Sequence, residues 1–229
     1  MGNPLPFRRP GRPGVRGSLV ALASALLCTL CAATPLQVSV LDKDGQPVVD
    51  AVVVVATASK AAPARPLPRE VTISQEKMRF VPAVSLVAPG AKAHFVNNDP
   101  WDHHVRASAA GVSQFDAGPA GSFELMISGK PEGKPGKTAD ASFDQPGAVL
   151  LGCHLHSSMR GHVYVSDSPW AALTGTDGLA TLDVPDGAAS IKVWHADQLI
   201  DIAPLQVVLG DGPARATLQL NVVPRRKRI

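Results

Sequence analysis

The chain has 229 residues, of which 45% are hydrophobic but only 4% aromatic, with 20 glycines and 21 prolines. This length allows one or two domains, and the composition favours short strands and turns over long helices. The formal net charge of +3 depends on two basic ends, because without the four arginines of residues 8–16 it becomes about −1, and without the four basic residues at 225–228 about −5. The charge therefore gives no reason to expect a nucleic-acid-binding protein.

Residues 1–33 have the pattern of a secretory signal peptide. Four arginines between positions 8 and 16, without an acid among them, precede the apolar run of residues 18–33, and Cys31-Ala32-Ala33 supplies small residues for cleavage. The run has only about 16 residues and leads directly into a polar strand, so we favour a removed signal over a retained membrane anchor. We therefore expect a periplasmic protein with no integral membrane span in its mature chain.

Removal of this segment leaves one cysteine, Cys153, in the mature chain. A disulfide within that chain is then impossible. An unpaired thiol in an oxidising compartment is a liability unless it is buried or bound to a metal. Cys153 is therefore the first residue whose role has to be explained.

Short strands are predicted along most of the remaining sequence. Residues 36–56 alternate and turn like a hairpin around Asp44-Gly45, and the Pro- and Ala-rich residues 61–68 predict a linker. Further strands are predicted at residues 93–96, 122–127, 148–151, 162–165, 180–184, 190–194, 205–209 and 216–222. No segment after residue 35 shows a sustained helical period, so we predict an all-β protein.

The two outer parts of the mature chain resemble one small β-sandwich. Residues 42–53, beginning Asp42-Lys43-Asp44-Gly45, are similar to the opening hairpin of carboxypeptidase-regulatory-like domains. Residues 176–187, with Thr176-Asp177-Gly178 and Pro185-Asp186-Gly187, are similar to the later strands of that sandwich.

This resemblance implies a discontinuous domain interrupted by a second one. The predicted parts are the signal peptide 1–33, the regulatory-like sandwich 34–67 and 168–223, the inserted domain 68–167, and a basic tail 224–229. Insertion at a loop is tolerated where the two chain ends lie close together. Two sandwiches in series, or one irregular β-domain, are the alternatives.

The strongest chemical signal is the segment Cys153-His154-Leu155-His156-Ser157-Ser158-Met159, which has the form C-x-x-H-x-x-M. It offers a thiolate, an imidazole and a thioether in one loop between two predicted strands. A thiolate with two imidazoles and a weak axial thioether is the ligand set of blue copper sites. Zinc, using Cys153, His103, His156 and another histidine, is the alternative, but it would leave Met159 unused.

The missing imidazole is predicted to be His103. Residues 95–105 end a strand, form a loop with Asn97-Asn98, and deliver His103 and His104 to the next strand. This pattern resembles plastocyanin and amicyanin, in which two asparagines, a short loop and the first copper histidine are followed by a valine two positions later.

The resemblance to these cupredoxins covers residues 70–167. The positions of Cys153, His156 and Met159 match the tight amicyanin spacing, and Phe143, Pro146 and Gly147 match the strand that leads into the cysteine. The resemblance implies a Greek-key β-sandwich that binds one type 1 copper ion through His103, Cys153, His156 and Met159. The whole mature chain is also similar to bacterial proteins labelled methylamine utilization protein.

Two positions depart from the family pattern. His104 stands where these proteins usually have an asparagine that ties the two ligand loops together, and its imidazole could donate such a bond or compete for metal. Leu150, Leu151 and Gly152 stand where a tyrosine is often found. An alternative role for the remaining histidines is a second copper site at the surface, built from His104, His154 or His162.

A metal ion whose coordination positions are all filled by protein side chains has none left for a substrate, which suits outer-sphere electron transfer. We therefore predict an electron carrier and not an enzyme. The resemblance implies that His156 passes the electron through a small apolar patch bordered by Leu155, Ser157, Ser158 and Pro100-Trp101. The expected partner is a c-type cytochrome or a periplasmic dehydrogenase. The alternatives are a periplasmic copper carrier or storage protein, and a structural or interaction module without redox activity.

Overall fold

The computed structural model describes residues 1–2, 33–110, 122–198, 200–210 and 212–222. The predicted basic tail, and the predicted signal peptide except for its residues 1, 2 and 33, lie outside these residues. Every regular element in the described part is a β-strand, which confirms the predicted all-β class. No helix long and apolar enough to cross a membrane is found there.

Sixteen strands are found in the described residues. In chain order they are β1 (Ala33–Leu41), β2 (Val52–Thr57), β3 (Glu70–Gln75), β4 (Phe80–Val81), β5 (Val84–Val87), β6 (Ala91–Asn97), β7 (His103–Ala109), β8 (Phe123–Ile127), β9 (Lys137–Phe143), β10 (Gly147–Cys153), β11 (Arg160–Val165), β12 (Trp170–Leu173), β13 (Leu179–Pro185), β14 (Gly187–Trp194), β15 (Leu205–Leu209) and β16 (Ala214–Gln219). The strands predicted from periodicity are all present, while β3, β4, β5, β9 and β12 were not individually predicted.

The middle of the chain forms two sheets around one core. A five-stranded sheet has the order β5-β11-β10-β7-β8, and a four-stranded sheet has the order β4-β3-β6-β9. Alternate residues of both sheets point inward, so that Ile73 and Phe95 of one sheet and Val105, Leu151 and Val163 of the other share one buried cluster. Cys153 and Met159 belong to the same cluster, which places the C-x-x-H-x-x-M loop at an end of this core.

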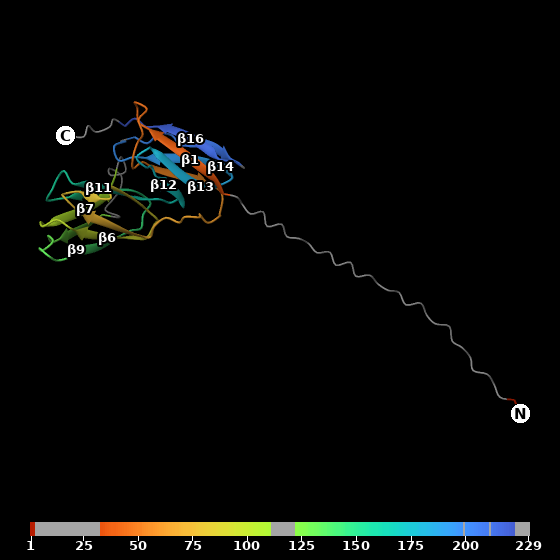
Figure 1. Ribbon diagram of the computed structural model, residues 1–229, viewed down its shortest axis with the longest axis horizontal. Helices are drawn as coiled ribbons and strands as arrows, with labels where there is room; N and C mark the ends of the chain where they lie inside the picture. The colour runs from red at the N-terminus through yellow and green to blue at the C-terminus, as the bar shows by residue number, and fades with distance from the viewer. Residues whose placement is uncertain (3–32, 111–121, 199, 211, 223–229) are drawn as a thin grey trace. The chain divides into compact units, whose positions relative to one another are not determined.

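The outer segments form two further sheets around a second core. Their orders are β13-β1-β16 and β12-β2-β14-β15, so each sheet combines a strand from before the middle segment with strands from after it. Figure 1 shows β1, in orange, among the blue strands of the C-terminal part. Valines 38, 40, 53 and 55 pack with Ile191 and Leu218 in this core.

The hairpin predicted for residues 36–56 forms only next to its turn, where Leu41 and Pro47 make an isolated antiparallel bridge and the Val48 N–H donates to the Val40 carbonyl at 3.0 Å. The turn itself exists, because Gly45 adopts a φ of 77° and its N–H donates to the Asp42 carbonyl. After this turn, however, β1 and β2 enter different sheets. Both strands nevertheless bury valines in the same core, one strand from each of its two sheets.

Tyr164, the chain's single tyrosine, lies in a third buried cluster with three valines and Trp194. Its ring centroid is 5.4 Å from that of Trp194. Burial, with the negative charges of Asp167 and Asp201, raises the pKa of its hydroxyl to about 12. The protonated side chain is therefore favoured by the folded state.

This shift predicts a loss of stability at alkaline pH. The unfolded chain loses the tyrosine proton at an ordinary pKa of 10.0, so the contribution of Tyr164 is complete below pH 10 and is lost as the pH rises to about 12. We expect Tyr164→Phe to remove about 1–2 kcal/mol of that pH dependence. Denaturant unfolding of both proteins across this range measures it, and identical pH slopes would contradict it.

Candidate metal centre

Cys153 is the last residue of β10, and Arg160 is the first residue of β11, its antiparallel neighbour. The connecting loop is closed by two main-chain hydrogen bonds: the Cys153 N–H donates to the Met159 carbonyl at 3.3 Å, and the Met159 N–H donates to the His156 carbonyl at 2.9 Å. Cys153 is 5% exposed and Met159 is 1% exposed. The loop therefore turns its sulfur-containing side chains toward the core.

His103 is the first residue of β7, which pairs with β10 so that Val105 lies opposite Cys153. Side chains alternate along β7: those of His103, Val105 and Ala107 are buried, whereas His104 is directed to the outer face. The His104 Nε2 lies 3.1 Å from the Glu124 carboxylate on β8. The strand register thus brings His103, and not His104, to the loop.

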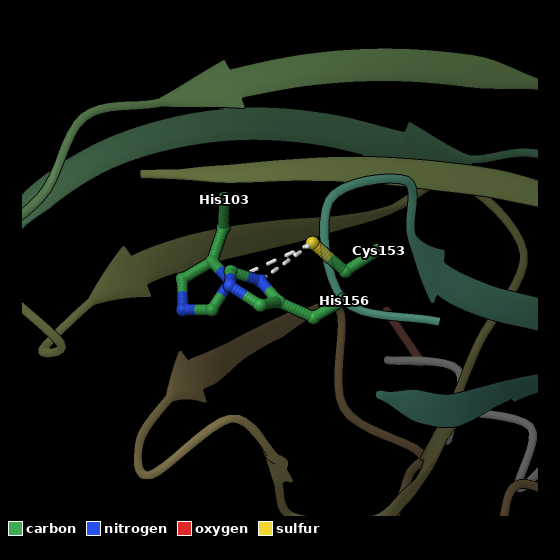
Figure 2. A group of neighbouring side chains, drawn as sticks. All are labelled: His103, Cys153 and His156. Atoms are coloured by element: carbon green, nitrogen blue, oxygen red, sulfur yellow. Dashed lines mark hydrogen bonds between the residues drawn. The ribbon is translucent and has the colours of Figure 1, made fainter. Parts of the chain in front are cut away.

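Three side chains that could hold a metal ion converge at this end of the core. The donor atoms of His103, Cys153 and His156 all lie within 4.8 Å of one another. Figure 2 shows both imidazoles turned toward the sulfur, with the Cys153 Sγ 3.6 Å from the His103 Nδ1 and 3.4 Å from the His156 Nδ1. The two rings meet edge to face, with centroids 4.9 Å apart. Met159, buried in the same core, follows His156 by three residues.

Asp99 orients the His103 ring from behind. The His103 Nε2 lies 3.0 Å from the Asp99 Oδ2, so that nitrogen carries the proton and donates it to the carboxylate. The lone pair of His103 is then on Nδ1, the nitrogen that faces Cys153. A carboxylate behind an imidazole fixes both the tautomer and the ring orientation of a metal ligand.

Asp99 is itself held as a carboxylate. It accepts hydrogen bonds from the Lys77 N–H at 2.6 Å and the Met78 N–H at 2.9 Å. Burial alone raises the pKa of Asp99, but the Met78 N–H, the His103 imidazole and the Lys77 N–H outweigh it, so the pKa lies below the usual 3.8. Asp99 was not predicted from the sequence, although its position four residues before His103 was a usable signal.

The loop between β6 and β7 is fixed by Asn97, which is fully buried. Its side-chain amide donates to the carbonyls of Trp101, Ile127 and Ser128 at 2.8–3.1 Å, and its Oδ1 accepts the Asp99 N–H. The loop also packs so closely on Gly129 that a Cβ there would lie 2.2 Å from the Pro100 carbonyl oxygen. These contacts hold His103 in place before any metal binds.

Substitution of Asp99 tests this arrangement. Asp99→Asn keeps one acceptor oxygen but loses the charge and the second acceptor, so we expect copper affinity to fall by about 10- to 100-fold. Competition with a chelator measures the affinity. Asp140→Asn is the matched control, because Asp140 bonds the exposed His94 at 2.8 Å on another sheet. Equal losses in the two variants would contradict a specific role for Asp99.

The other residues predicted to border the site or to form a surface site differ in their neighbours. Leu155 and Trp101 are 51% and 41% exposed, and Pro100, Ser157 and Ser158 are exposed beside them in the sequence. His154 is also exposed, with its ring centroid 5.7 Å from that of His104. His162 lies apart from these two, 5.5 Å from the ring of Trp194. The structure therefore brings together two of the three histidines considered for a surface site.

A comparison with protein families matches residues 68–166 to copper binding proteins of the plastocyanin/azurin family. This segment is a cupredoxin domain. Similar solved structures include amicyanin from Paracoccus versutus (21% identity, 49% of this chain and 97% of that chain, TM-score 0.32) and a reduced Cu(I) amicyanin mutant (20%, 50% and 98%, TM-score 0.34). A pseudoazurin from Sinorhizobium meliltoi is also similar (22% identity, 43% and 75%, TM-score 0.31). No curated protein matches the chain.

The cupredoxin domain fits a copper ion by the chemistry of its donors. One cysteine sulfur and two imidazoles converge, both imidazoles present Nδ1 to the sulfur, and Met159 can supply a thioether from the same loop. This combination of soft and borderline donors selects copper over magnesium or calcium. The family is one of copper binding proteins, and copper is the cofactor of this domain.

Proposed function

We propose that this protein is an exported blue copper protein that carries single electrons between redox partners. Copper is held by His103, Cys153 and His156, with Met159 as the axial ligand. The observation that carries this proposal is the buried Cys153 sulfur with two imidazole Nδ1 atoms close to it, at 3.6 and 3.4 Å. Four protein donors leave no position for a substrate, which favours electron transfer over bond-making chemistry.

The rigidity of the site supports the same role. Cys153 and His103 lie on paired strands, and the Asn97 amide and the Asp99 carboxylate hold the loop and ring of His103. Donors fixed in this way need little rearrangement when the ion changes oxidation state. A carrier that releases copper needs ligands that can move away from the ion, so this scaffold favours the electron carrier over the copper carrier.

His156 is the proposed exit for the electron. It is half-buried, whereas His103 is fully buried. Leu155, next to His156 in the chain, and Trp101, on the loop before His103, are exposed and would supply the apolar surface for this exit. A small apolar surface suits a brief encounter with a redox protein, such as a c-type cytochrome or a periplasmic dehydrogenase.

The test is the optical and EPR spectrum of the full-length mature chain with one equivalent of Cu(II). An intense blue thiolate-to-copper band, with reversible bleaching on reduction and no copper loss to a chelator in either state, is the expected result. A colourless copper complex would contradict a blue site. A blue complex that loses Cu(I) readily to the chelator would favour the copper carrier.

The proposal also includes the domain arrangement. Residues 34–67 and 168–223 form one carboxypeptidase-regulatory-like sandwich, and the cupredoxin domain, residues 68–167, is inserted between its second and third strands. The support is that the strands of the two outer segments share two sheets and one core, while the middle strands have their own.

Expression of residues 68–168 alone tests this arrangement. We expect a folded fragment that binds copper with the spectrum of the full chain, because the donors and the residues that orient them all lie between Gln75 and Met159. The comparison is made by circular dichroism and by copper titration. A soluble fragment without copper binding would mean that the outer strands are needed to complete the site.

A further inference from the structure

We propose a second copper site on the outer face of the five-stranded sheet, formed by His104, His154 and Met126. His104 points to the opposite face of β7 from His103, and none of the three residues belongs to the buried donor set. The second site is independent of the proposed electron transfer, because it can bind copper whether or not the buried site is blue.

Strand register brings the three residues together. His104 pairs directly with Met126 across β7 and β8, and side chains of directly paired residues lie on the same face with Cβ atoms about 4.5–5.5 Å apart. His104 is partly exposed, and Met126 is 60% exposed. The His154 N–H donates to the His104 carbonyl at 2.9 Å, which fixes the start of the C-x-x-H-x-x-M loop beside His104 and Met126.

The two imidazoles are close enough to share a metal ion. Their centroids lie 5.7 Å apart with an interplanar angle of 64°, and the rings of His103 and His156 lie 4.9 Å apart at the same angle. The arrangement at the surface therefore resembles the histidine pair of the buried site, with a slightly wider spacing.

A carboxylate also backs the surface histidine. The His104 Nε2 lies 3.1 Å from the Glu124 Oε2, so Nε2 can donate its proton and leave the Nδ1 lone pair for a metal. The same relation holds between His103 and Asp99 at 3.0 Å. Two imidazoles and a thioether are donors that suit copper in particular, because the sulfur of Met126 is a poor ligand for harder ions.

Arg106 opposes this site and gives the proposal a second, independent test. Its Nη1 lies 3.5 Å from the His154 Nδ1, and its Nε lies 2.8 Å from the Glu124 Oε1. The guanidinium therefore occupies one imidazole nitrogen and neutralises the carboxylate behind the other. Copper binding requires this side chain to turn away, so Arg106→Gln should raise the copper affinity of the second site. If His104, Glu124 and Arg106 form only a structural ion-pair network, the same variant should weaken that network and leave copper affinity no higher.

The experiment is a Cu(II) titration of the full mature chain, followed by EPR and by visible absorption. The first equivalent should enter the buried site, and the second should give a tetragonal signal with nitrogen coupling that adds nothing to the blue band. His154→Asn should lose the second signal and retain the first, and Arg106→Gln should retain both and hold the second copper more tightly. Met126→Leu should weaken retention of the second ion as Cu(I) more than as Cu(II).

The matched control is His94→Asn. His94 lies on β6 and its imidazole is hydrogen-bonded to the Asp140 carboxylate on β9, much as His104 on β7 is bonded to Glu124 on β8. This variant should keep both signals. Retention of the second signal in His154→Asn, or its loss in His94→Asn, would overturn the proposed ligands. A second signal that appears without any blue first signal would contradict the proposed electron carrier and leave the surface site standing.

Discussion

Cys153→Ser is expected to abolish the intense visible absorption of the Cu(II) protein. That absorption arises from charge transfer between a thiolate and copper, and Cys153 is the only cysteine of the predicted mature chain. A serine hydroxyl is a much weaker ligand and cannot supply the transition, although two imidazoles and a thioether remain. The visible spectrum, recorded with equal copper bound to both proteins, measures the effect.

The control for this variant is Ser157→Ala, an exposed position in the same loop. It should retain the full band, because its side chain is directed to solvent. The fold of Cys153→Ser should persist, since a hydroxyl buried without a partner costs about 1–3 kcal/mol. Circular dichroism and the unfolding midpoint check this. A serine variant that stays folded and blue would show that Cys153 is not the copper thiolate.

The second large effect is expected from His103→Ala, which should destroy the blue Cu(II) colour. This change removes an imidazole whose Nδ1 lies 3.6 Å from the Cys153 sulfur, and it opens a cavity in a fully buried position. His103→Gly with added imidazole separates the two effects. Return of the colour with the small ligand would show that the lost donor, and not a collapsed core, caused the bleaching.

The adjacent histidine provides the sharpest comparison. His104→Asn should leave the blue band nearly intact, because the His104 side chain lies on the outer face of β7 near Glu124. The same variant should lose the second, colourless copper if the surface site exists. Bleaching by His104→Asn with retention of colour in His103→Ala would mean that β7 binds copper in the opposite register. Equal bleaching by both would favour a copper carrier with exchanging ligands.

The C-x-x-H-x-x-M loop is the part of the site that was predictable from sequence. Cys153, His156 and Met159 lie within seven residues, and strands at both ends limit the loop to one compact turn. Strand alternation then predicts that only one of the two adjacent histidines can face this loop. The structure brings His103 to Cys153 and His156, while the four-residue ligand set stays a prediction that the substitutions above will test.

The residues that support the site were less predictable, because their partners are distant in sequence. Asp99 acquires its role only when the turn at Lys77 and Met78 supplies two N–H donors. The pairing of His104 with Met126 depends on the register of β7 and β8, which no local pattern fixes. A one-residue slip in that register would move Met126 to the other face of the sheet.

Local sequence therefore determined the all-β class, the Asp44-Gly45 turn, most strands and the C-x-x-H-x-x-M loop, because each depends on residues close together in the chain. The tertiary structure alone decided that β1 and β2 enter different sheets and that β1 pairs with β13 and β16, more than 130 residues away. Alternating valines identify a strand with one buried face, but many partners can cover that face. The partner strand is chosen when the whole chain packs into shared cores. No single segment contains the information for that choice.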